Sequence, residues 1–180
     1  MNARISHGSR IWPAGLLALL LLWPAGLGLH AAAPRGLQAG EPAPAFQTQD
    51  LAGNAVELAD LRGEWVLLNF WATWCVPCIK EFPSMQRLAQ KMAGEPFRIV
   101  ALNVMDSRAR IQGFLKRHKL DLPIWRDRDG GIHRKYRVRA FPTSVLVGPD
   151  GTVLSVHEGA ATWDAPRRVA QLRHALGKAP

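Results

Sequence analysis

The chain has 180 residues, of which 48% are hydrophobic and only two are cysteines. This composition supplies the core of one ordinary domain, and it excludes both wholesale disorder and a small fold held together by several disulfides. The net charge of +9 comes from scattered basic residues, so we expect a solvated basic surface without a nucleic-acid partner. The alternative is a preference for acidic partners or anionic lipid.

The first 33 residues have the pattern of an export signal or a membrane anchor. Arg4 and Arg10 precede an apolar run from Ile11 to Leu29 that carries no charge and nearly reaches the length of a membrane span. The small residues 31–33 suit a cleavage site, but Pro34 would hinder a peptidase there, so we favour an uncleaved anchor. The two arginines should stay cytoplasmic, which sends the rest of the chain across the membrane.

Residues 34–45 are expected to form an extended linker, because prolines, glycines and alanines dominate them. The folded domain is then expected over residues 46–180. It begins with two short strands, Phe46–Leu51 and Ala55–Leu58, on either side of Ala52-Gly53-Asn54. This pattern is typical of a β-hairpin.

A strand–helix–strand unit follows the hairpin. Trp65–Trp71 is an almost unbroken apolar run, which indicates a strand buried on both faces of a parallel sheet. Apolar residues at three- and four-residue spacing predict a helix from Val76 to about Met92. Phe97–Met105 is a second buried strand, so the three elements predict a right-handed crossover unit.

Shorter elements come next. Asp106-Ser107 offers an N-cap for a helix over Arg108–His118. A short strand near Ile124-Trp125 and a short helix over Ile132–Val138 are expected after it.

The last part of the chain has the pattern of two strands and a helix. Thr143–Val147 and Thr152–His157 bracket the turn sequence Gly148-Pro149-Asp150-Gly151. Asp164-Ala165-Pro166 is expected to cap a final helix that ends near Leu176. The order of elements predicts an α/β fold with a mixed central sheet and flanking helices.

Cys75 and Cys78 fall at the start of the helix that follows the first buried strand. Their spacing there places both side chains on one turn, within reach of a disulfide. A helix N-terminus presents free N–H groups and the positive end of the dipole, which lower the pKa of a thiol. We expect Cys75 to be the exposed nucleophile and Cys78 the more buried thiol that resolves mixed disulfides.

Other uses of the cysteine pair fit less well. A structural disulfide would close a loop too short to stabilise the fold much. A metal site needs further ligands, which would have to come from histidines: His118, His133, His157 or His174. Reversible redox chemistry, without a cofactor or a resident metal, is the favoured interpretation.

The block from Val66 to Cys78, VLLNFWATWCVPC, followed by Glu81-Phe82-Pro83, resembles the TlpA/ResA/CcmG group of membrane-anchored, thioredoxin-fold thiol–disulfide oxidoreductases. The segment YRVRAFPT, residues 136–143, agrees with this resemblance. It covers roughly residues 41–176 and implies a thioredoxin fold with an N-terminal β-hairpin and an extra αβ insertion.

The resemblance implies a substrate-binding surface beside the cysteines. Pro142 would be a cis-proline that faces the disulfide, and the backbone of Phe141 would bind an extended substrate segment. The alternative is a trans proline at the start of an edge strand. Trp74 would flank the nucleophile and form part of the docking surface, with plain packing as its alternative.

The resemblance also implies a role for an acid. Glu81 would tune the thiol pKa or relay the proton of Cys78; the alternative is a solvated first-turn carboxylate favoured by the helix dipole. Asn69 stands six residues before Cys75, where cytoplasmic thioredoxins carry a buried aspartate. The absence of that proton acceptor favours a role for Glu81.

The function implied is a disulfide reductase that faces the periplasm, tethered to the inner membrane or released after signal cleavage. Its clients would be exported proteins with disulfides, such as apocytochrome c or copper-site proteins, and its electrons would come from a membrane donor of the CcdA/DsbD type. The oxidising direction and a metal-binding chaperone are the rivals. Peroxiredoxins and Sco-type copper-delivery proteins do not match the spacing of the two cysteines.

Overall fold

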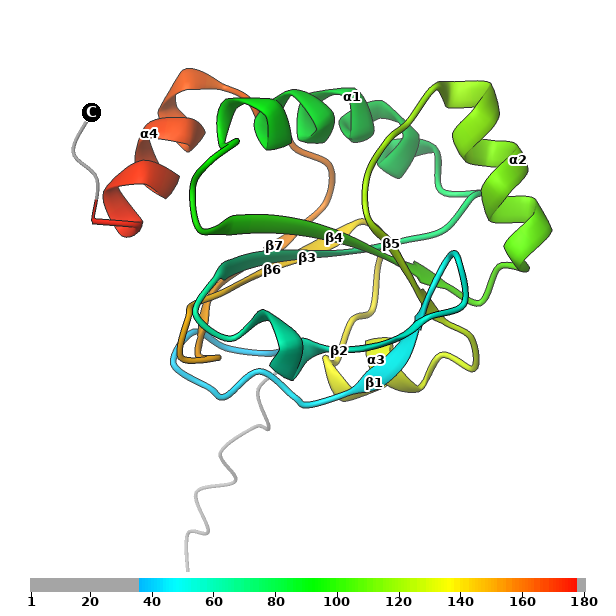
Figure 1. Ribbon diagram of the computed structural model, residues 1–180, viewed down its shortest axis with the longest axis horizontal. Helices are drawn as coiled ribbons and strands as arrows, with labels where there is room; N and C mark the ends of the chain where they lie inside the picture. Colours follow the sequence, from blue (N-terminus) through cyan, green and yellow to red (C-terminus); the bar gives the residue numbers. More distant parts are fainter. Residues whose placement is uncertain (1–35, 178–180) are drawn as a thin grey trace, which may run out of the picture. The chain divides into compact units, whose positions relative to one another are not determined.

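The computed structural model describes residues 36–177, in which seven strands form one mixed sheet in the order β2-β1-β5-β4-β3-β6-β7 (Figure 1). The strands are β1 (Gln47–Asp50), β2 (Ala55–Glu57), β3 (Trp65–Trp71), β4 (Phe97–Val104), β5 (Ile124–Asp127), β6 (Thr143–Val147) and β7 (Val153–Glu158). The helices are α1 (Val76–Lys91), α2 (Arg108–His118), α3 (Gly131–Lys135) and α4 (Pro166–Ala175), with the 3-10 helix η1 (Leu58–Leu61). This is the thioredoxin-like α/β fold that the sequence predicts.

The expected signal or anchor, residues 1–33, lies outside the described residues. None of the helices between residues 36 and 177 combines the length and hydropathy of a membrane span.

The centre of the sheet confirms the predicted crossover unit. β3 pairs with β4 in parallel over its whole length, from Trp65 opposite Phe97 to Trp71 opposite Asn103. α1 connects the two strands, and all of β3 after its first residue is buried. β6 and β7 extend the sheet antiparallel on one side. On the other side β5 runs parallel to β4, and the β1–β2 hairpin pairs antiparallel with β5.

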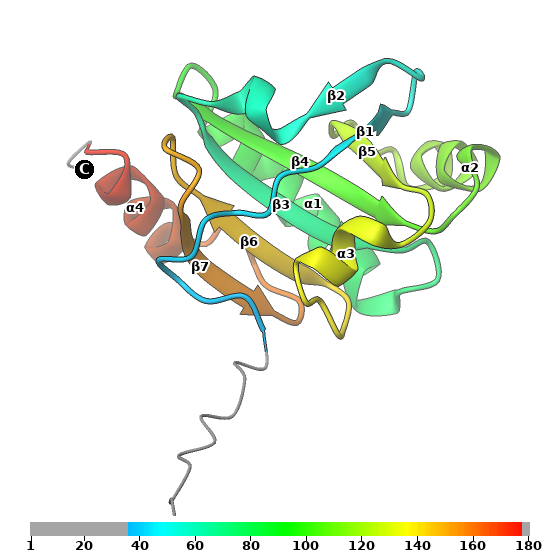
Figure 2. The same cartoon turned by 90° about the horizontal axis from the view of Figure 1, so that it is seen from below.

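Both faces of the sheet are covered, as the apolar central strands require. Helices α1, α2 and α4 cover one face, and α3, η1 and the N-terminal segment cover the other (Figures 1 and 2). An aromatic cluster fills the first layer, where the ring centroid of Trp71 lies 4.8 Å from that of Phe82 and 5.1 Å from that of Phe114. Tyr136 and Phe70 occupy the second layer.

The segment expected to be a linker is part of the domain in its described portion, residues 36–45. Its backbone bonds to the start of β7: the Gly40 N–H donates to the Val153 carbonyl, and the Val153 N–H donates to the Glu41 carbonyl. Leu37 and Ala43 are buried in the second layer. The Pro/Gly-rich composition favours an extended chain here, but the buried apolar side chains fix that chain on the sheet.

Two local predictions are wrong in detail. α3 ends at Lys135 rather than near Val138, because Arg137 adopts the left-handed conformation with φ of 54°. Asp164 does not cap α4, whose N-cap is Ala165 without a side-chain hydrogen bond. The carboxylate of Asp164 turns instead to α1, where it accepts hydrogen bonds from Arg87 Nε and Nη2 at 2.7 and 3.2 Å.

Candidate active site

The cysteines lie at the edge of the sheet where β3 ends. Because β3 and β4 are parallel, their carboxyl ends meet at this edge, and β6, antiparallel to β3, begins there. Thr143, the first residue of β6, pairs with Phe70 near the end of β3. The Cys75 loop, the loop after β4 and the Phe141–Pro142 segment therefore converge in space.

Cys75 and Cys78 form a disulfide with an S–S distance of 2.03 Å. Cys75 is the N-cap residue of α1, and its Sγ accepts a hydrogen bond from the Cys78 N–H at 3.3 Å. When the disulfide is reduced, this N–H and the positive end of the helix dipole favour a thiolate at Cys75. Pro77 fits the first turn because its missing N–H leaves no helical hydrogen bond unmade.

The two sulfurs differ in burial less than the sequence analysis expects. Cys78 is fully buried, and Cys75 is only 4% exposed in the disulfide-bonded form. Its neighbours Trp74 and Val76 project outward instead, at 66% and 59% exposed. Cys75 is the more accessible of the pair, but a substrate sulfur reaches it past these two side chains.

The proposed substrate-binding residues lie beside this protruding pair. The Phe141–Pro142 peptide bond is cis, as the resemblance implies. The ring centroids of Trp74 and Phe141 are 5.9 Å apart in an edge-on arrangement. Met105, at the end of β4, is also exposed. Trp74, Val76 and Phe141 thus place apolar side chains near Cys75.

Asp106 holds the loop that precedes Cys75, a role the sequence analysis misses. Its carboxylate accepts hydrogen bonds from the Thr73 N–H at 2.7 Å, the Thr73 hydroxyl at 3.0 Å and Asn103 Nδ2 at 3.0 Å. Ser107 alone caps α2, by accepting from the Arg110 N–H. Asp106 and Ser107 both precede α2, so the sequence suggested either residue as its cap. The contact of Asp106 with Thr73 depends on the parallel pairing of β3 and β4, which the local sequence does not show.

Glu81 is buried one turn after Cys78, so the alternative of a solvated carboxylate is wrong. It is 2% exposed, and its oxygens accept hydrogen bonds from Asn69 Nδ2 at 2.8 Å, Trp163 Nε1 at 2.9 Å and the Ala161 N–H at 3.1 Å. Burial raises the pKa of Glu81 above its usual value, although these hydrogen bonds and the charge of Arg168 oppose the shift. Glu81 therefore takes up a proton more readily than an exposed carboxylate does.

The donors to Glu81 come from two separate parts of the chain. Asn69 on β3 bonds both Glu81 and the Ser144 hydroxyl of β6, at 2.8 and 2.9 Å. Trp163 and Ala161 belong to the segment between β7 and α4, some 80 residues away along the chain. No local motif marks Ser144, Ala161 or Trp163 as neighbours of the active site.

A metal-binding alternative requires ligands beyond the two sulfurs. Over residues 36–177 no group of three or more His, Cys, Asp or Glu side chains is placed to hold a metal ion.

Comparison with known proteins agrees with this geometry. A model of the AhpC/TSA family matches residues 39–156. The thiol-disulfide oxidoreductase ResA of Bacillus subtilis is 37% identical over 131 residues, which cover 73% of this chain and 73% of ResA. The thioredoxin-like protein YneN of the same organism is 35% identical over 157 residues, which cover 84% of this chain and 91% of YneN.

Solved structures give the same result. A Chlorobium tepidum protein described as thiol:disulfide interchange protein DsbE superimposes with a TM-score of 0.72 and 34% identity, covering 78% of this chain and 99% of that protein. StoA from Bacillus subtilis gives a TM-score of 0.61 with 25% identity, over 73% of this chain and 96% of StoA. The fold is similar to that of named thiol–disulfide exchange proteins.

Proposed function

This chain belongs to the AhpC/TSA family and is a thiol–disulfide oxidoreductase, and from this premise we propose that it reduces disulfide bonds in exported client proteins. The observation that carries the proposal is the Cys75–Cys78 disulfide at the N-terminus of α1, with Cys75 Sγ accepting a backbone hydrogen bond.

Catalysis proceeds by two exchange steps at these sulfurs. The Cys75 thiolate attacks one sulfur of the client disulfide, forms a mixed disulfide and releases the other client sulfur as a thiol. Cys78 then loses its proton and attacks Cys75 Sγ, which frees the second client thiol. The client gains two electrons and two protons, and the enzyme is left with the Cys75–Cys78 disulfide.

Glu81 is proposed to accept the proton of Cys78 in the second step. A buried thiol must be deprotonated before it can attack, so the second step needs a proton acceptor near Cys78. The raised pKa of Glu81 and its position one turn after Cys78 on α1 support this role. Asn69, an amide, cannot serve as that acceptor.

The client is proposed to bind as an extended segment across Trp74, Phe141 and Pro142. The exposed Trp74 indole, packed edge-on against Phe141, offers an apolar contact next to Cys75. A client segment that lies there presents its disulfide to the more accessible sulfur.

The direction and setting of the reaction complete the proposal. We place the domain in the periplasm, tethered to the inner membrane by residues 1–33 or released after their cleavage. Apocytochrome c and copper-site proteins are candidate clients, and a membrane electron donor of the CcdA/DsbD type would restore the reduced dithiol. Arg4 and Arg10, followed by the uncharged apolar run from Ile11 to Leu29, support this location.

The Cys78→Ser variant tests the mechanism. Without the resolving thiol the second step cannot occur, so clients should accumulate as mixed disulfides on Cys75, visible as reductant-sensitive adducts on non-reducing gels. Cys75→Ser is the control and should form none. Adducts of equal amount in Cys75→Ser, or client reduction that survives the loss of Cys75, would refute the scheme.

The reduction potential tests the direction. A reductase should equilibrate with glutathione at a potential well below that of the strong oxidant DsbA, about −120 mV. Equilibration of the full chain with glutathione mixtures, read by alkylation of the free thiols, gives this number. A potential close to that of DsbA would assign the oxidising direction instead.

A further inference from the structure

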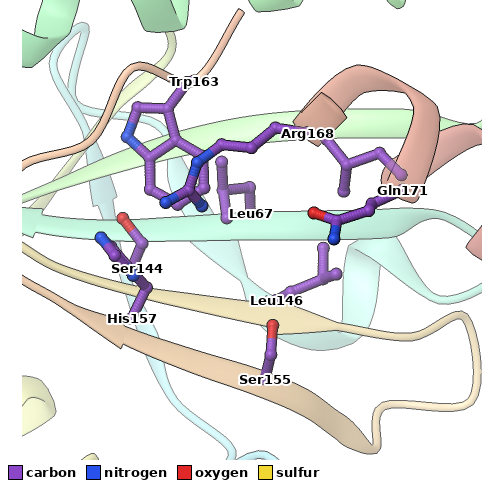
Figure 3. A pocket seen from close by; sticks show the side chains of 9 residues that line it. Leu67, Ser144, Leu146, Ser155, His157, Trp163, Arg168 and Gln171 are labelled. Carbon is purple, nitrogen blue, oxygen red and sulfur yellow. The ribbon is translucent and has the colours of Figure 1, made fainter. Parts of the chain in front are cut away.

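A cavity of about 140 Å³ lies between α4 and the strands β3, β6 and β7, and neither cysteine lines it. Its apolar wall is formed by Leu67, Leu146 and Leu172. Figure 3 shows polar side chains of the strands and of α4 turned into the same space. For comparison, an apolar cavity of about 150 Å³ engineered in another protein binds benzene, so the volume suits a small organic molecule.

Arg168 of α4 brings a positive charge to this cavity. Its guanidinium carbon lies 4.9 Å from the ring centroid of Trp163. A guanidinium placed over an aromatic ring can still direct N–H groups at its edge to a carboxylate in a bidentate manner. Within residues 36–177, no carboxylate is at ion-pair distance from Arg168.

His157 of β7 brings a polar atom that lacks a partner. Its Nε2 is buried and makes no hydrogen bond within the described residues, although burial of such a group without a bond is costly. Burial and the neighbouring charge of Arg168 both lower the pKa of His157. A hydrogen bond from the same ring to the backbone of Ala160 opposes this shift. An anion in the cavity would offset the charge of Arg168 and favour the protonated ring, in which Nε2 can donate a hydrogen bond to that anion.

Ser144 supplies a third donor. Its Oγ accepts the hydrogen bond from Asn69 at 2.9 Å, so its own hydrogen is available to donate. In Figure 3 this hydroxyl points toward the space between Trp163 and Arg168. Arg168, His157 and Ser144 together place three donors beside the apolar wall of the cavity. This combination suits an organic anion with an apolar group better than a fully hydrated inorganic ion.

We propose that this cavity binds a small monocarboxylic acid. Its carboxylate pairs with the guanidinium edge of Arg168 and accepts hydrogen bonds from His157 and Ser144, while its apolar body packs on the three leucines. One positive side chain in the wall matches a single negative charge on the ligand.

The cavity wall is also in contact with Glu81, which ties this site to the proposed function. Trp163 donates to one oxygen of Glu81, and Asn69 joins the other oxygen to Ser144. A bound carboxylate offsets the charge of Arg168, which opposes the raised pKa of Glu81. Occupancy of the cavity therefore strengthens proton binding by Glu81. The effect of occupancy on catalysis rests on the proposed role of Glu81 as a proton acceptor, whereas binding of the monocarboxylic acid does not.

Isothermal titration calorimetry of benzoate binding to the oxidised full chain tests the proposal. We expect saturable one-site binding, with affinity about tenfold lower in Arg168→Gln because a charge-assisted pair is lost. His157→Phe, which keeps an aromatic ring against Trp163, should also weaken binding. Arg167→Gln, an exposed neighbour on α4 outside the cavity wall, is the matched control and should bind like the wild type.

Benzamide and inorganic phosphate complete the design. Benzamide lacks the charge and phosphate lacks the apolar body, so both should bind more weakly than benzoate. The proposal is overturned if benzoate shows no saturable binding, if Arg168→Gln binds it as tightly as wild type, or if phosphate binds equally well. Because the oxidised protein carries out no exchange, this outcome is independent of whether the dithiol reduces clients.

Discussion

At the scale of single residues, Glu81 occupies an environment that is unusual for an acidic side chain. It is buried as a carboxyl group among three hydrogen-bond donors, on the same helix as both cysteines. Its raised pKa means that the folded protein holds the Glu81 proton more tightly than the unfolded chain does. This has a measurable effect on stability.

The Glu81→Gln variant should lose a pH dependence that the wild type shows. Below the unfolded-state pKa of glutamate, both states carry the proton and the group has no effect. As pH rises from there through the folded-state pKa, wild-type stability falls, because the buried group must ionise, and the loss persists at higher pH. The glutamine side chain of the variant does not ionise, so the stability of the variant relative to wild type should increase with pH. Urea unfolding of the oxidised proteins across a pH series measures this difference.

The glutamine is expected to fit the site. Its oxygen can accept from Trp163 and Ala161. Its nitrogen would face Asn69 Nδ2, so the Asn69 amide has to turn over, which brings its Oδ1, unpartnered within residues 36–177, toward the glutamine nitrogen and the Ser144 hydroxyl. Glu158→Gln, the removal of an exposed carboxylate, is the control. Parallel stability curves for wild type and Glu81→Gln would contradict a raised pKa.

At the scale of elements, strand ends and helix starts assemble the site. The parallel pairing of β3 with β4 places Asp106 against the loop before Cys75, and the antiparallel pairing of β3 with β6 places Pro142 beside it. α1 begins directly after its N-cap Cys75, and the Cys78 N–H donates to the Cys75 sulfur. The sheet, rather than the neighbour in sequence, brings these segments together.

The start of α2 provides a test at this scale. Ser107 Oγ accepts from the Arg110 N–H at 3.2 Å, so Ser107→Ala should lower the free energy of unfolding by about 1 kcal/mol. Ser107→Asp restores an acceptor and adds a negative charge at the helix N-terminus, so it should retain wild-type stability. Denaturant unfolding compares the three proteins. Equal stability of Ser107→Ala and wild type would mean that the cap contributes nothing.

At the scale of the whole described domain, the sheet is completed by a segment whose composition indicates a linker. Residues 36–45 bond to the start of β7 and bury Leu37 and Ala43 in the second layer of the core. Truncation of this segment would therefore expose core residues rather than shorten a tether.

Leu37→Ala tests whether the segment belongs to the core. A buried leucine cut to alanine typically costs about 2–5 kcal/mol, and Leu37 is 4% exposed, so a loss in this range is expected from denaturant unfolding. Gln38→Ala, at an exposed position of the same segment, should change stability little. A similar small change in both variants would show that residues 36–45 act as a linker after all.

The sequence by itself determined the elements and the reactive pair. The signals that predicted the elements are local. The 3.6-residue periodicity of α1 and the unbroken apolar run of β3 show which faces of one element are buried. The turn motif before β7 reflects the conformation of four residues. Cys75 and Cys78 are close because they share one helical turn, which needs no tertiary information. The order of elements predicted the α/β class, and the thioredoxin fold and the cis Phe141–Pro142 bond followed from motif resemblance.

Only the tertiary structure decided which distant groups meet. Trp163 and Ala161 bond to Glu81 from some 80 residues away along the chain. Asp106, predicted to cap a helix, bonds instead to the active-site loop. Asp164, also predicted to cap a helix, bonds instead to Arg87. The physical reason is common to all of them. A polar side chain bonds to whatever donor or acceptor the packed elements bring within about 3 Å, and that partner depends on sheet order and register, which no single segment encodes.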